Sequence, residues 1–64
     1  MKEYKGEVWQ DGFRVAMAQG RDYAKVNAET AHYAAMYSQD GPVDLKYFEK
    51  ARKVWKLVGY LPHG

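Results

Sequence analysis

The chain contains no cysteine, so no disulfide bond stabilises it, and this composition fits a reducing compartment. It has no apolar run near the roughly 18 residues that a transmembrane helix needs, and its first residues lead into no apolar signal-peptide core. Only two histidines are available to a metal, and no glycine-rich phosphate-binding loop is present. We therefore expect a cytoplasmic protein without a metal or other cofactor.

Aromatic residues are the abundant feature: two Trp, six Tyr and two Phe make up 16% of the 64 residues. A domain of this size buries only about 60% of the surface of its unfolded chain, so ten rings are more than its core can enclose. Some rings should lie at the surface, where Tyr and Trp are favoured contact residues of interfaces. The composition predicts a single small domain over residues 1–64 that presents aromatic surface.

Positive charge is concentrated in the last third of the chain. The net charge is only +2, but residues 44–64 hold five Lys and Arg against two Asp and Glu, which gives this segment +3. A basic surface suits an acidic partner or the phosphates of a nucleic acid.

Two segments are predicted to be helical, 23–37 and 44–58. The first is rich in alanine and can be capped by Asp22 or Asn27. In the second, Asp44 is a suitable N-cap and Gly59 fits the position after the helix end. Apolar residues three and four positions apart define one face of this second helix: Leu45, Phe48, Ala51, Trp55 and Val58. The sequence 38–42, Ser-Gln-Asp-Gly-Pro, marks the turn between the two segments.

The segment 4–19 fits two structures. As a helix, it places apolar and small residues at intervals of three and four from Trp9 to Gly20. As a hairpin, it turns at Asp11-Gly12 and pairs Gln10 with Phe13. The hairpin then places two sets on opposite faces: Tyr4, Val8, Val15 and Met17 on one, and Lys5, Glu7, Trp9 and Arg14 on the other. We expect an all-α, three-helix domain, with an N-terminal β-hairpin followed by two helices as the alternative.

The residues that could support catalysis are sparse. Glu29 and His32 form a Glu-x-x-His pair on one helical face, but a di-iron site needs a second copy and further carboxylates. Ser38 is the only serine, and it lies in a turn-forming cluster where serine is expected anyway. A domain this small also has little room for a substrate pocket. We expect a protein that binds rather than catalyses.

The chain resembles, in type, the small accessory proteins of bacteriophages, many of which bind and inhibit or redirect a host enzyme. The resemblance rests on its length, its lack of cysteine, its aromatic content and the pattern Trp9-x-x-Gly12-Phe13-x-x-Ala16-Met17-x-x-Gly20. It implies a modulator that acts by stoichiometric binding, and it names no target.

These observations predict a non-enzymatic inhibitor or modulator of a larger protein with an acidic or nucleic-acid-binding surface. The alternatives are a small DNA- or RNA-binding protein that uses the basic 44–58 segment, and a subunit that associates with itself as a homodimer. We predict eight contact residues for the partner: Tyr33, Tyr37, Tyr47, Lys50, Arg52, Lys53, Trp55 and Lys56.

Overall fold

The first twenty residues form a β-hairpin and not a helix. The computed structural model describes residues 2–63 of the chain, and the side chains of residues 2–61. Strands β1 (Glu3–Gln10) and β2 (Phe13–Gly20) are antiparallel, and Gln10 pairs with Phe13. Asp11 and Gly12 connect them with φ of 54° and 82°, the left-handed pair that a two-residue type I′ turn requires. The Asp11-Gly12 turn therefore determines the structure of this segment, and the helical spacing of its apolar residues does not.

The predicted middle helix is confirmed. Helix α1 spans Tyr23–Tyr37, and a 3₁₀ turn, η1, continues it over Ser38–Asp40. The Asp22 carboxylate accepts a hydrogen bond from the backbone amide of Lys25 at 3.3 Å, so Asp22 is the N-cap. Val26, Thr30 and Ala34 are its buried residues, spaced by four along one face.

The prediction of a helix over 44–58 is wrong, and with it the all-α fold. This segment is divided between strands β3 (Val43–Ala51) and β4 (Val54–His63), joined by Arg52 and Lys53. The spacing of three and four was coincidental, because Leu45 and Phe48 lie on opposite faces of β3. The alternative fold fails here as well, since its hairpin is present but its second helix is not.

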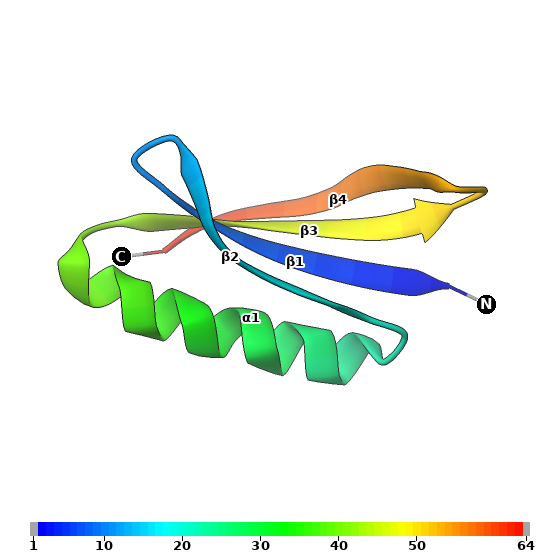
Figure 1. Cartoon of the computed structure of the whole chain (residues 1–64), viewed down its shortest axis with the longest axis horizontal. Coiled ribbons are helices and arrows are strands. Elements are labelled where there is room, and N and C mark those ends of the chain that lie inside the picture. The colour runs from blue at the N-terminus through cyan, green and yellow to red at the C-terminus, as the bar shows by residue number, and fades with distance from the viewer. Residues whose placement is uncertain (1, 64) are drawn as a thin grey trace.

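The four strands form one antiparallel sheet in the order β2-β1-β3-β4 (Figure 1). Helix α1 lies along one face of this sheet, over β1 and β2 and partly over β3, and the opposite face carries no second layer within residues 2–63. No helix among these residues is long and apolar enough to span a membrane.

The core lies between α1 and the two central strands. Its fully buried cluster comprises Val8, Ala34, Val43 and Leu45, with Tyr33, Tyr37 and Tyr47 packed around it. Half-buried tyrosines thus complete the small core.

The turn between β3 and β4 is strained. Arg52 and Lys53 have φ of 52° and 71°, a left-handed conformation that suits Asn-Gly and that costs side chains with a Cβ about 1 kcal/mol each. We expect Arg52→Asn combined with Lys53→Gly to stabilise the fold by about 1 kcal/mol and to raise its Tm by about 4–8 °C.

Thermal unfolding followed by circular dichroism measures this change. The matched control is Arg52→Ala with Lys53→Ala, which removes the same charges without relieving the backbone. Equal stabilisation by both double variants would attribute the effect to charge repulsion and not to φ.

Candidate functional site

The open face of the sheet, opposite α1, gathers aromatic and basic side chains. Cross-strand pairing places Lys5 opposite Phe48, Glu7 opposite Lys46, and Lys50 opposite Trp55. Trp9 pairs with Arg14 across the first hairpin, beyond a bulge that shifts the register after Val8. We call this set the aromatic-basic face: Lys5, Trp9, Arg14, Lys46, Phe48, Lys50 and Trp55.

Glu7 is the buried anchor of the aromatic-basic face. Its side chain is 6% exposed, and its carboxylate accepts hydrogen bonds from Trp9 Nε1 at 2.9 Å and Arg14 Nη1 at 3.1 Å. Lys5 Nζ lies 3.4 Å from the same carboxylate. Burial pushes the pKa of Glu7 up, but the two hydrogen bonds and the charge of Lys5 outweigh it, so the pKa lies below its ordinary value. Glu7 therefore stays ionised and holds Trp9, Arg14 and Lys5 in place.

The lysines of this face lie over the aromatic rings. Lys5 Nζ is 4.6 Å from the ring centroids of both Phe48 and Trp55, and Lys46 Nζ is 4.1 Å from that of Trp9. Lys50 Nζ is 5.7 Å from Trp55. All three rings are half-buried rather than enclosed. Flat π surfaces and ammonium groups therefore alternate across one solvent-facing surface.

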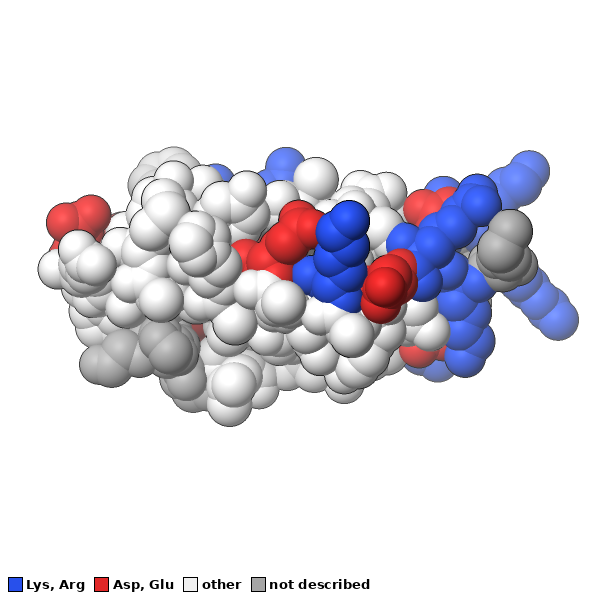
Figure 2. All heavy atoms as spheres, turned by 90° about the horizontal axis from the view of Figure 1, so that it is seen from below, with Lys and Arg blue, Asp and Glu red and all other residues white. Residues whose placement is uncertain are grey.

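Charge is also polarised along the molecule. Viewed from the helix side, Lys and Arg gather at one end (Figure 2). This basic end includes the β3–β4 turn, with Arg52 and Lys53, and the adjacent Lys50 and Lys56. The opposite end holds the β1–β2 turn, η1 and the start of β3, where three aspartates lie: Asp11, Asp40 and Asp44.

The structure brings together only part of the predicted contact set. Lys50 and Trp55 lie on the aromatic-basic face, and Arg52 and Lys53 extend it at the turn. Lys56 pairs with Glu49, on the α1 side of the sheet. The three tyrosines of the set are also on that side, packed against the core: Tyr33, Tyr37 and Tyr47. The eight residues therefore do not form one patch.

Five residues of the aromatic-basic face were absent from that set: Lys5, Trp9, Arg14, Lys46 and Phe48. A signal for three of them was present, because the hairpin alternative placed Lys5, Trp9 and Arg14 on one face with Glu7. Phe48 and Lys46 were missed because a helical reading of 44–58 turns them away from each other, whereas alternate residues of a strand share a face.

Comparisons with protein-family models, curated proteins and solved structures found no match for this chain. The site must therefore be interpreted from its own chemistry. Among the described residues there is no group of three or more His, Cys, Asp or Glu placed to hold a metal ion.

Proposed function

We propose that this protein binds single-stranded nucleic acid on the aromatic-basic face. The observation that carries the proposal is the alternation of three aromatic rings, Trp9, Phe48 and Trp55, with lysine ammonium groups 4.1–5.7 Å from their centroids. Exposed aromatic rings on a sheet stack unpaired bases, and neighbouring cations neutralise phosphates. A duplex hides the faces of its bases, so this surface favours a single strand.

The lysines that cover the rings do not oppose this use. At the partly exposed Lys46 and Lys50, a cation over a ring contributes about 0.5–1 kcal/mol, whereas stacking a base on an aromatic side chain contributes about 1–3 kcal/mol. Lys46 and Lys50, once displaced, can pair with a phosphate next to the stacked base, whereas Lys5 stays paired with Glu7, because its side chain is only 13% exposed. Replacing a lysine–ring contact with a base–ring stack and a lysine–phosphate contact is therefore favourable.

The strained turn supports the same function. Two basic residues, Arg52 and Lys53, occupy positions where Asn-Gly would give a more stable turn. Strain of this kind is retained where a side chain has a task. Here the task would be to place two further cations beside the aromatic-basic face, for contact with phosphates beyond the stacked bases. We propose the cytoplasm as the compartment in which the protein acts, and this function requires no catalysis or cofactor.

The test is fluorescence anisotropy with labelled single-stranded DNA, single-stranded RNA and duplex DNA of equal length. We expect both single strands to bind more tightly than the duplex, with affinity that falls as salt rises. Trp9→Leu and Phe48→Leu, which keep apolar bulk, should each weaken binding by about 5–150-fold. Phe13→Leu is the control, because this ring is 73% exposed and pairs with Gln10 off the aromatic-basic face. Equal binding of duplex and single strand, unaffected by the Trp9 and Phe48 variants, would contradict the proposal.

A second candidate function is stoichiometric binding and inhibition of a larger protein. Phe13 favours it, because this ring projects beside the β1–β2 turn and belongs neither to the core nor to the aromatic-basic face. An exposed aromatic residue at a hairpin tip is suited to fill a partner's pocket. In a pull-down from nuclease-treated lysate, this function predicts one stoichiometric protein whose capture is lost with Phe13→Ala and kept with Phe48→Leu.

A further inference from the structure

Half of the α1 side of the sheet is uncovered. Four strands about 4.8 Å apart span roughly 19 Å, whereas one helix with its side chains is about 10–12 Å wide. Helix α1 lies over β1 and β2, so β4 has almost no cover. Val54, Val58 and Leu61 are 65%, 57% and 54% exposed in consequence. This surface has room for one more helix.

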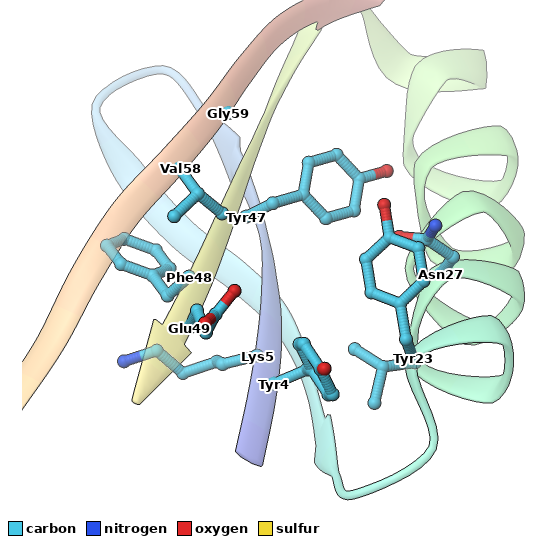
Figure 3. Close-up of a pocket in the computed structure, with 10 residues that line it drawn as sticks. Tyr4, Lys5, Tyr23, Asn27, Tyr47, Phe48, Glu49, Val58 and Gly59 are labelled. Carbon is cyan, nitrogen blue, oxygen red and sulfur yellow. The ribbon is translucent and has the colours of Figure 1, made fainter. Parts of the chain in front are cut away.

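A groove runs between α1 and this uncovered half. Tyr4, Tyr23 and Tyr47 project into it from β1, α1 and β3, while Val58 and Gly59 line its far side (Figure 3). The cavity measures about 260 Å³. Burial and the neighbouring Tyr23 raise the pKa of Tyr47, so this hydroxyl stays neutral in the groove. The groove is thus lined mainly by tyrosine rings and apolar groups, with two charged residues, Lys5 and Glu49, in its lining and Glu49 paired with Lys2.

The flank of α1 that borders the groove is made of alanine. Asn27 lines the groove, and residues three and four positions from it on a helix share its flank. Ala24 and Ala31 lie on this flank, with Ala35 one turn beyond Ala31, and all three are exposed. Ala28 lies on the outer face of the helix, beside Glu29 and His32. The charged residues Lys25 and Glu29 lie instead on the flank toward β2. Small side chains allow another helix to approach α1 closely.

We propose that the occupant of this groove is helix α1 of a second copy of the chain. In a two-fold dimer, each α1 lies beside the other along its alanine flank and covers the exposed half of the partner's sheet. The two helices then form a middle layer between two sheets. Such an interface is self-complementary, as two-fold symmetry requires, and it places both aromatic-basic faces outward. The dimer therefore does not depend on nucleic-acid binding.

Charge complementarity fixes the direction of the second helix. The basic end of the molecule carries Lys56 on the groove side of β4, and Asp40 lies at the opposite end, after α1. When the two helices run antiparallel, Asp40 of each copy approaches the basic end of the other. The negative end of each helix dipole does the same. A parallel arrangement would bring like charges together.

The exposed apolar surface on this side favours association. Val54, Val58, Leu61 and Tyr23 are each more than half exposed, and an interface of standard size buries roughly 800 Å² on each partner. A 64-residue chain without disulfides also gains needed stability by association.

Sedimentation velocity over a concentration series from about 1 μM to about 1 mM tests the dimer. We expect a monomer–dimer equilibrium whose Kd rises at least about tenfold with Val58→Glu and with Ala31→Glu, because each places a charge in an apolar interface. The matched control is Leu57→Glu. Leu57 is 52% exposed on the same strand but pairs with Phe48 on the open face, so the dimer should persist.

Three results would overturn the proposal. A monomer at every concentration excludes the dimer. Dissociation by Leu57→Glu as well as Val58→Glu indicates that β4 edges pair, since that arrangement gives side chains on both faces of the strand new cross-strand neighbours. Insensitivity to Ala31→Glu excludes α1 as the occupant. Circular dichroism of each variant confirms that the monomer is folded.

Charge reversal tests the antiparallel direction separately. Asp40→Lys and Lys56→Asp should each weaken the dimer by about fivefold, and the two together should restore it. Both residues are exposed, so neither change disturbs the monomer fold. Additive weakening in the double variant would contradict the antiparallel arrangement.

Discussion

Gly6→Ala is expected to destabilise the fold by about 3 kcal/mol, a large part of the total stability of a domain of this size. Gly6 lies in the centre of β1, where α1 crosses it most closely. A Cβ at this position would overlap the Thr30 hydroxyl and lie 2.8 Å and 2.9 Å from its Cβ and Cγ2. Thr30 has no freedom to move, because it is fully buried and donates a 2.7 Å hydrogen bond to the Val26 carbonyl. The whole helix would have to shift away from the sheet.

Urea unfolding followed by far-UV circular dichroism measures this loss, with Gly59→Ala as the matched control. Gly59 is also a strand glycine opposite Tyr47, but its new Cβ would meet Tyr47 only at ordinary contact distances of 3.7 Å and 3.8 Å. We expect that variant to be neutral or slightly stabilised. Thr30→Gly should recover part of the Gly6→Ala loss, since the three nearest atoms all belong to the Thr30 side chain. A loss of the same size in both glycine variants would show that strand propensity, and not the helix contact, is responsible.

The sequence predicted those parts of the fold that local chemistry determines. The α1 helix follows from its alanines and the Asp22 cap, and the Asp11-Gly12 turn follows from its left-handed residues. The β3–β4 hairpin had no such signal, because its turn consists of Arg52 and Lys53. Its first strand, β3, is stabilised by pairing with β1, a contact between distant segments that periodicity does not reveal.

The aromatic-basic face was predictable only through the correct strand register. The hairpin alternative placed four residues of the first hairpin on one face, and the structure confirms this placement: Lys5, Glu7, Trp9 and Arg14. Met17 was assigned to the opposite face, but the bulge after Val8 brings it next to Arg14. A bulge changes which residues share a face of the sheet, and it leaves no clear trace in the composition. The residues of one face therefore cannot be assigned from alternation alone.

Glu7→Gln is expected to lower the free energy of unfolding by about 2–3 kcal/mol at neutral pH. The substitution keeps the size of the side chain and can still accept from Trp9, but it removes the charge between Lys5 and Arg14. Glu3→Gln is the matched control on the same strand. Its carboxylate makes only an exposed 3.5 Å contact with Gln19, so the loss should be within about 0.5 kcal/mol.

Acidification distinguishes the charge of Glu7 from its shape. Because folding lowers the pKa of Glu7, its stabilising contribution is complete above the ordinary carboxyl pKa and is lost as the pH falls through the lowered value. The difference in stability between the native chain and Glu7→Gln should therefore shrink between about pH 5 and pH 3. A difference that stays constant with pH would mean that Gln fits the site poorly, and that ionisation of Glu7 contributes nothing. If the difference does shrink, the same carboxylate that orders Trp9, Arg14 and Lys5 also makes the aromatic-basic face sensitive to acid.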